Sequence, residues 1–281
     1  CSDSRRPQVR AADAGCDRNR TSPFAFTGTR FEFRAVGSSQ SVSGPLIVLN
    51  TMLADSLEWV GNRLETELNS GAELSTAILT VLKEVMNEHG VVVFGGNGYS
   101  EEWHKMAVEE RGLANLPTTA DALPILKDES IEDLFKKTGV LTPVELESRF
   151  EVYAEQYILS IDVEAKLVID MAKTMIYPAA VEYLSKLSST IASLSDLGVT
   201  FDKGSAQTIA DLTNSMMAAA TKLSEAIEKH DFASPDEHMA YCASTLRPLM
   251  DEVRGYVDSL EGEIADSFWP LPTYQEMLFI K

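Results

Sequence analysis

Thr142-Pro143-Val144-Glu145 opens the longest helical stretch of this 281-residue chain and decides its fold class. Threonine is a good N-cap residue, proline suits the first helical position, and a glutamate three residues after the cap completes a capping box. A helical apolar period then runs nearly to Leu194, and Pro178 inside it predicts a kink. The segment from Gly198 to Gly204 breaks the pattern.

Two further helices are predicted after this break. The first follows Ser205 and carries one apolar stripe, formed by Ile209, Leu212, Met216, Ala219, Leu223 and Ile227. Ser234-Pro235 starts the second, which runs to about Ile264. Long helices with short connections predict an antiparallel bundle.

Upstream of Thr142 the pattern is also largely helical. One predicted helix runs from Leu46 to Asn69 and stops at Gly71, with apolar residues on a helical period at Leu46, Leu49, Leu53, Leu57, Val60, Leu64 and Leu68. A second runs from about Glu73 to His89. Ser100 can cap a third that starts at Glu101.

The strand signals lie near the N-terminus. Residues 24–27 and 30–36 read as two strands joined by a turn at Gly28-Thr29, and residues 91–94 (Val-Val-Val-Phe) are a third candidate. Two strands alone are marginal in water, so this hairpin must join a larger sheet. The predicted class is therefore α+β and mainly α.

Charge and cysteine content restrict the partners. The chain has 24 Lys plus Arg against 43 Asp plus Glu, a net charge of −19. This surplus argues against nucleic acid or an anionic membrane as main partner. Residues 1–34 are net basic, so anion handling is expected there. Three scattered cysteines and the lack of a run of about 20 apolar residues favour a reducing, cytoplasmic setting.

Arg30-Phe31-Glu32-Phe33-Arg34 is the most informative stretch for chemistry. In a strand the phenylalanines share one face, and the carboxylate lies between two guanidiniums on the other. Arginine binds phosphate or carboxylate through bidentate hydrogen bonds, and glutamate supplies a hard oxygen ligand for Mg²⁺ or Mn²⁺. A solvated strand face with cross-strand salt bridges explains the same residues, and composition alone favours that explanation.

A longer pattern resembles the type III glutamine synthetases. It comprises residues 17–28 (DRNRTSPFAFTG), 30–34 (RFEFR) and 37–39 (GSS). Further similar stretches follow in order at 97–104 (NGYSEEWH), 148–151 (SRFE) and 269–274 (WPLPTY). The resemblance runs from Asp17 to the C-terminus, and several separated motifs in order make it specific.

The resemblance implies a division of the chain into three parts. Residues 1–16 match poorly, and 17–115 correspond to the end of the catalytic domain, with the β-hairpin as a remnant of its barrel. Residues 116–281 correspond to the helical C-terminal domain, and Pro117 and Pro124 mark a boundary region. The chain begins with Cys1 rather than Met and is expected to be a piece of a longer protein.

The resemblance also implies a chemistry: an ATP-dependent glutamate–ammonia ligase of nitrogen metabolism that forms glutamine through a γ-glutamyl phosphate. Arg20 and Arg34 are the implied catalytic residues, contacting phosphate and the glutamate substrate. Asn19 and Arg30 join them in binding substrate or ATP, and Glu32 ligates Mg²⁺ or Mn²⁺. A ring-shaped homo-oligomer is implied as well.

Two departures limit the activity expected of these 281 residues. The arginine that the better-known type I family carries shortly after its Asn-Arg-Ser motif has no counterpart in residues 22–26. The small N-terminal domain and most metal-binding carboxylates are also absent, so the isolated chain is expected to be inactive. The alternative is a non-catalytic helical module for interaction or oligomerisation.

Overall fold

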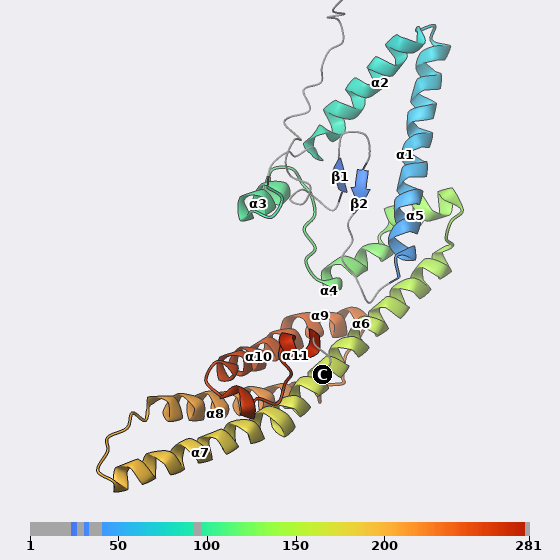
Figure 1. Ribbon diagram of the computed structural model, residues 1–281. Coiled ribbons are helices and arrows are strands. Elements are labelled where there is room, and N and C mark those ends of the chain that lie inside the picture. Colours follow the sequence, from blue (N-terminus) through green and yellow to red (C-terminus); the bar gives the residue numbers. More distant parts are fainter. Residues whose placement is uncertain (1–23, 27–30, 34–40, 93–96, 279–281) are drawn as a thin grey trace, which may run out of the picture. The chain divides into compact units, whose positions relative to one another are not determined.

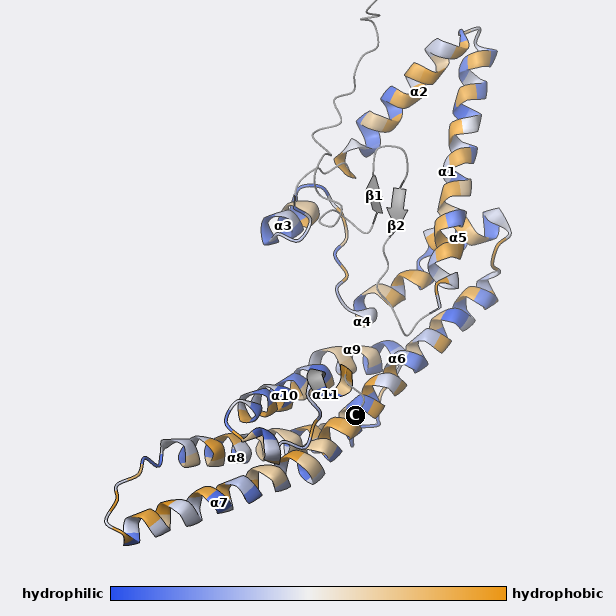
Figure 2. Ribbon diagram, in the orientation of Figure 1, coloured by the Kyte–Doolittle hydropathy of each residue, from blue (hydrophilic) through white to orange (hydrophobic). Residues whose placement is uncertain are grey.

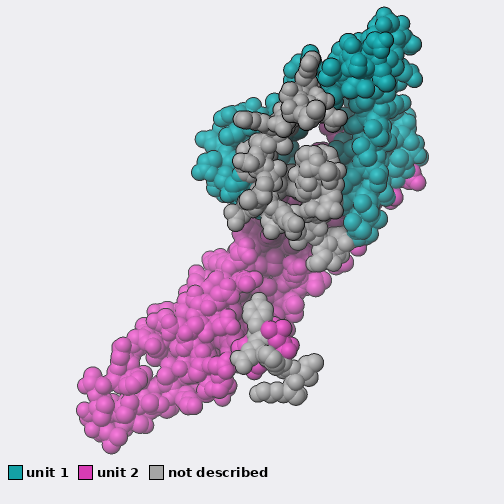
Figure 3. Space-filling view, turned by 45° about the horizontal axis from the view of Figure 1, so that its top comes forward, with its two compact units in different colours: residues 1–116, 129–143 teal, residues 117–128, 144–281 magenta. Residues whose placement is uncertain are grey.

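The protein is described by a computed structural model that covers residues 24–26, 31–33, 41–92 and 97–278 (Figure 1). These residues are mainly helical, which confirms the mainly α part of the predicted class. They form two compact units, residues 1–116 with 129–143 and residues 117–128 with 144–281 (Figure 3). None of the helices in these ranges is long and apolar enough to cross a membrane.

Unit 1 contains two short strands, β1 (Phe24–Phe26) and β2 (Phe31–Phe33). They pair antiparallel, and Ala25 lies opposite Glu32. Their assignment to a catalytic barrel stays a prediction.

Two helices of unit 1, α1 (Ser43–Asn69) and α2 (Leu74–His89), begin and end close to the predicted positions. Helix α3 (Glu101–Glu109) begins at the predicted residue, and α5 (Glu129–Thr138) was not predicted. Gly71 ends α1 with φ +94°, a left-handed conformation that favours glycine. Ser100 caps α3 as predicted, since its side chain accepts a hydrogen bond from the Trp103 main-chain N–H at 3.2 Å.

The predicted strand at residues 91–94 is wrong in its described half. Gly90–Val92 continue α2 as a 3₁₀ turn. The guanidinium of Arg111 donates to the Val91 carbonyl over 2.9 Å, so a side chain uses the acceptor that a strand would offer to a neighbour. Residues 93 and 94 lie outside the described residues.

Unit 2 is built on one long helical stretch that begins at Pro143, as predicted. It comprises α6 (Pro143–Met171), a π turn (Ala172–Ile176) and α7 (Tyr177–Asp196). The π turn stands where a proline kink was predicted. Pro178 has no N–H to donate, and the Tyr177 N–H before it bonds the Ala172 carbonyl five residues back.

A second helix of unit 2 has the same combination of a π turn and a following proline. It comprises α9 (Pro235–Tyr241), a π turn (Cys242–Leu246) and α10 (Arg247–Glu261), with Pro248 after the turn. The hydroxyls of Thr174 and Ser244, each four residues before the proline, donate to the carbonyl four residues back, at 2.7 Å in both cases. Each hydroxyl thus satisfies a carbonyl next to the altered hydrogen-bond register.

Helix α8 (Gly204–Ala226) is the centre of the bundle. It returns beside α7 after the loop at residues 197–203, and α10 packs along it (Figure 1). The predicted apolar stripe of α8 is confirmed, since Ile209, Met216 and Leu223 are fully buried. They join Ile176 and Leu246 of the π turns in one hydrophobic cluster.

The remaining elements of unit 2 are short. They are α4 (Thr119–Ala122), a 3₁₀ turn (Leu123–Lys127), a 3₁₀ turn (Asp266–Phe268) and α11 (Tyr274–Leu278). Thr118 and Asp121 form a capping box at α4. A smaller cluster of Phe150, Ala154 and Met239 packs against the first two of these elements.

Candidate functional site

Glu32 is the predicted site residue whose backbone the structure describes. It is the middle residue of β2, between two Phe–Phe pairs of the ladder, Phe24 with Phe33 and Phe26 with Phe31. The strand position expected for Glu32 is therefore present. Asn19, Arg20, Arg30 and Arg34 lie outside the described residues, so their predicted roles stay predictions.

The described residues do not form a metal site by themselves. Among them, no group of three or more His, Cys, Asp or Glu side chains could hold a metal ion. A hard divalent cation takes about six oxygen ligands, of which the predicted ligand Glu32 would supply one. No chemical step is therefore derived through the metal.

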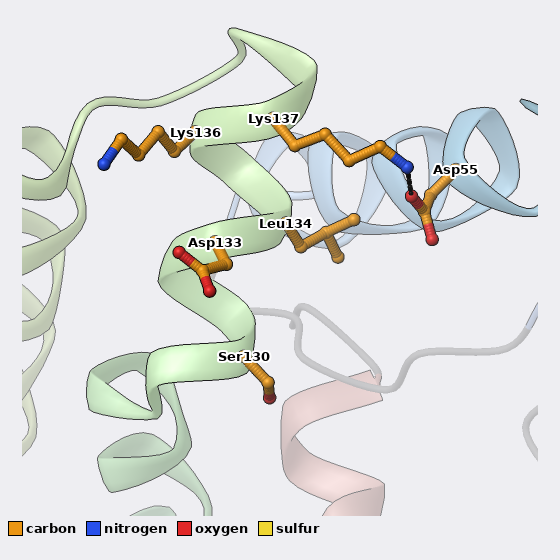
Figure 4. Close-up of a pocket in the computed structure, with 6 residues that line it drawn as sticks. All are labelled: Asp55, Ser130, Asp133, Leu134, Lys136 and Lys137. Atoms are coloured by element: carbon orange, nitrogen blue, oxygen red, sulfur yellow. Dashed lines mark hydrogen bonds and ion pairs between the residues drawn. The ribbon is translucent and has the colours of Figure 1, made fainter.

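A groove in unit 1 brings charged side chains of α1 and α5 together. It is lined by Asp55, Ser130, Asp133, Leu134, Lys136 and Lys137 (Figure 4). The Lys137 Nζ lies 2.7 Å from Asp55 Oδ1 and 2.7 Å from Glu58 Oε2. Hydrogen bonds to these two carboxylates raise the pKa of Lys137 above its ordinary value. This lysine stays protonated and joins two helices, and it does not suit the task of a general base.

A second groove lies between α6 and α10 in unit 2. Its charged lining residues are Glu164, Arg247, Asp251 and Arg254, above the apolar side chains of Leu167, Val168 and Met250. Burial raises the pKa of the nearby Tyr157, and Arg247 opposes this shift. Two acids and two arginines give this groove no preference for ligands of one sign.

Two of the downstream stretches that carry the family resemblance lie in unit 2. Phe150, from the 148–151 stretch, is buried on α6 beneath the Lys127 ammonium, which lies 4.1 Å from its ring centroid. Near the 269–274 tail, Phe268 packs against Tyr183 of α7 with ring centroids 5.3 Å apart. These contacts hold the bundle together.

Comparisons with known proteins agree with these motifs. Residues 77–195 match the family described as the glutamine synthetase C-terminal domain. The chain is 38% identical to the type-3 glutamine synthetase of Dictyostelium discoideum over 94% of the chain and 37% of that protein. It is 33% identical to a glutamine synthetase of Bacteroides fragilis, over 94% and 37% of the two chains. For a glutamine synthetase of Butyrivibrio fibrisolvens the identity is 37%, over 94% and 38%.

These matches define what the chain resembles. Over 94% of its length it is similar to glutamine synthetases, and residues 77–195 match the C-terminal domain of that family. Within that family, the predicted resemblance to the type III enzymes is confirmed by the match to the Dictyostelium protein. The chain spans somewhat over a third of the length of these relatives.

The sequence prediction missed the Lys137 contact with Asp55 and Glu58. Lys136-Lys137 stand in the last turn of α5, a helix not predicted from the sequence. The available signal was the helical spacing of Ile131, Leu134 and Phe135 between charged residues. The partner carboxylates lie 82 and 79 residues earlier, so local reasoning could not find them.

Proposed function

We propose that this chain forms part of a glutamate–ammonia ligase that makes glutamine from glutamate, ammonia and ATP through a γ-glutamyl phosphate. The supporting observation is the 38% identity to a type-3 glutamine synthetase over 94% of the chain. Five predicted site residues, Asn19, Arg20, Arg30, Glu32 and Arg34, carry the proposed site within a motif that resembles this family. Residues 17–115 then end the catalytic domain, and 116–281 form the helical C-terminal domain.

In this proposal the arginines supply fixed positive charge. Arg20 contacts the phosphate being transferred, and Arg34 holds the glutamate substrate. Phosphoryl transfer relies on positioned cations more than on covalent chemistry, so such residues are the expected contribution of this chain. Glu32 offers one oxygen to Mg²⁺ or Mn²⁺. A cytoplasmic homo-oligomer with ring-type assembly belongs to the same proposal.

A full-length chimera tests the proposed activity. In it, the present chain replaces the aligned stretch of the Dictyostelium type-3 glutamine synthetase, and glutamine formation is measured. The chimera should be active, whereas Arg34→Gln and Glu32→Gln should each lower kcat/KM by about 100-fold or more. Arg254→Gln, on the exposed side of α10, is the matched control and should leave the rate unchanged.

The isolated 281-residue chain should show little or no synthetase activity. One metal carboxylate does not build the coordination shell that the reaction needs. Robust γ-glutamyl transfer by the purified chain would contradict this expectation.

A second candidate function is a non-catalytic helical interaction module. The hydrophobic cluster within unit 2 favours it, because Ile209, Met216 and Leu223 are buried there by neighbouring helices. The coding sequence upstream distinguishes the two. An in-frame continuation that encodes a small β-grasp domain and further carboxylates supports the enzyme, and a start codon directly before Cys1 supports the module.

A further inference from the structure

Asn97-Gly98 opens the 97–104 stretch, to which the proposed function gives no chemical role. Asn97 alone among the asparagines of the chain is followed by glycine. Glycine has no Cβ, so the side chain before it can approach its main-chain nitrogen closely. Asn97 is exposed and Gly98 is half-buried, so water reaches both residues. The dipeptide therefore places an amide side chain beside an accessible nitrogen nucleophile.

The turn holds the Asn97 side chain by its oxygen. The Tyr99 main-chain N–H donates to Asn97 Oδ1 over 3.1 Å. This hydrogen bond fixes the amide and draws electron density from Cγ, the atom that a nucleophile attacks. The same N–H stabilises negative charge that develops on Oδ1 during an attack, as the donors of an oxyanion hole do.

The Gly98 nitrogen belongs to a peptide group whose carbonyl is that of Asn97. The Ser100 main-chain N–H donates to this carbonyl over 3.3 Å. A donor on the peptide oxygen favours the anion that forms when the Gly98 N–H loses its proton. The Gly98 carbonyl accepts from His104 Nε2 over 3.2 Å, since a carbonyl has no proton to donate. Hydrogen bonds of the fold thus activate both the amide carbon and the nitrogen.

We propose that Asn97-Gly98 is a self-modifying site, at which the folded chain converts the Asn97 amide into aspartate and isoaspartate with water as the co-reactant. This inference does not depend on the proposed ligase activity.

The reaction consumes one water and releases one ammonia. Hydroxide removes the Gly98 N–H proton, the nitrogen forms a bond to Asn97 Cγ, and the bond from Cγ to the amide nitrogen breaks. The amide nitrogen takes a proton from water and leaves as ammonia, which gives a five-membered succinimide. Water then opens this ring. Addition at Cγ breaks the new bond and gives aspartate, whereas addition at the main-chain carbonyl carbon breaks the original peptide bond and gives isoaspartate.

The two products should differ in their effect on α3. This helix mixes hydrophilic and apolar residues (Figure 2) and buries none of them, so it depends on local contacts at its N-terminus. Aspartate adds a negative charge near that N-terminus and keeps the backbone unchanged. Isoaspartate lengthens the main chain by one atom and removes from it the carbonyl that Ser100 binds. Isoaspartate should therefore loosen α3, whereas aspartate should leave it intact.

Ageing of the purified chain near neutral pH tests the site. Peptide mass spectrometry, with separation of the aspartate and isoaspartate forms, follows each asparagine. Asn97 should deamidate at least tenfold faster than Asn115, an exposed loop residue followed by leucine, whose side chain hinders approach to its nitrogen. The rate at Asn97 should rise with hydroxide concentration, and Gly98→Ala should lower it at least tenfold.

The same experiment in denaturant measures what the fold contributes. Asn97 should react at least as fast in the native chain as in the unfolded chain, because folding supplies the N–H donors of Tyr99 and Ser100. Asn214, an exposed residue within α8, is the internal control. It should react more slowly in the native chain, since the helix holds the next nitrogen away from its side chain.

Amide hydrogen exchange separates the two products. The isoaspartate form of the aged protein should exchange at least tenfold faster in residues 103–109 than the unaged chain. Freshly purified Asn97→Asp carries the charge without the longer backbone and should exchange like the unaged chain.

Three results would overturn the inference. They are a rate at Asn97 less than tenfold above that at Asn115, a native chain that reacts more slowly than the unfolded chain, and a rate that Gly98→Ala leaves unchanged. The first two comparisons use the unaltered sequence, so they decide the matter even where Gly98→Ala disturbs the turn.

Discussion

The Tyr241 hydroxyl donates a hydrogen bond to the main-chain carbonyl of Ala226, 3.0 Å away. Ala226 is the last residue of α8 and Tyr241 the last of α9, so this bond joins two helix ends across the connecting loop. The Tyr241 ring also lies 5.2 Å from that of Phe232 and 4.7 Å from the Lys229 ammonium. The return of the chain from α8 into α9 is therefore fixed by a side chain of α9.

Tyr241→Phe tests this connection. The ring stays, but the partly buried Ala226 carbonyl loses a donor, so the free energy of unfolding should fall by about 0.5–1.5 kcal/mol. Chemical denaturation followed by circular dichroism measures the change. Tyr153→Phe, at an exposed position of α6, should leave the midpoint where it was. Equal effects of the two substitutions would show that the Tyr241 hydrogen bond makes no specific contribution to the free energy of unfolding.

Deletion of Lys173 tests the first π turn. Lys173 is exposed within Ala172–Ile176, so the deletion removes an extra backbone residue and little packing. Deletion of the extra residue of a π turn leaves an ordinary α-helical turn, so α7 keeps its phase and Ala179 and Ala180 stay in the core. The free energy of unfolding should therefore change by no more than about 1 kcal/mol. Deletion of Lys166, which is exposed in the regular part of α6, is the matched control: it rotates all following residues of the helix by about 100° and should cost several times more. A Lys173 deletion as costly as the Lys166 deletion would contradict the presence of an extra residue in this turn.

The Cys242 thiol should make stability depend on pH in the alkaline range. Burial, helped by Asp162, raises its pKa to about 11 from 9.0. The folded state thus favours the neutral thiol. Its contribution is fully present below pH 9 and is lost as the pH rises toward 11. The free energy of unfolding should fall by about 1–3 kcal/mol across that range.

Cys242→Ala isolates this effect. The substitution should flatten the slope of stability between pH 9 and 10, above which Tyr157, whose pKa is also raised, begins to act in the same direction. In a Cys1→Ser/Cys16→Ser background, the native protein should resist thiol reagents at pH 8, because a buried neutral thiol is a poor nucleophile. Rapid labelling of the folded protein would contradict the burial of Cys242.

Lys137→Met tests the attachment of α5 to α1. The ion pairs with Asp55 and Glu58 are exposed, so their loss should raise amide exchange in α5 at low salt and have little effect near 1 M salt. Lys136→Met is the matched control, because Lys136 extends away from Asp55 on the same helix (Figure 4). An effect of Lys137→Met that is indifferent to salt would point to packing of the side-chain stem instead.

Local chemistry predicted most helix boundaries. Ser100 and Ser234 were predicted as helix starts from the residue types at and after the cap, and each side chain accepts the expected main-chain hydrogen bond. Gly71 and Gly198 end helices with positive φ. These signals act within a few residues, so one sequence is enough to find them.

The errors arise where distant contacts or a single extra residue decide the structure. Val91 and Val92 have strand-forming side chains, yet Arg111 holds that segment in a turn. The period of apolar residues does not reveal a π turn, because the turn adds only one residue between two segments that both have the ordinary helical period. The prolines at 178 and 248, each after a hydroxyl residue four positions earlier, were the available signal.

The proposed active site depends on motif resemblance much more than on geometry. Glu32 lies in a strand as expected, while Asn19, Arg20, Arg30 and Arg34 lie outside the described residues. Residue types at these spacings also suit an ordinary solvated strand. The order of several separated motifs is what favours the family resemblance, and the 38% identity to a type-3 glutamine synthetase supports that resemblance.

The π turns at 172–176 and 242–246 also affect the design of fusions to this bundle. Each π turn adds one residue to its helix. A heptad pattern counted from Pro143 therefore no longer marks the same face of the helix from Tyr177 onward. A graft at the tip formed by α7 and α8 should therefore take its numbering from Tyr177 and from Gly204, the first residues of those helices.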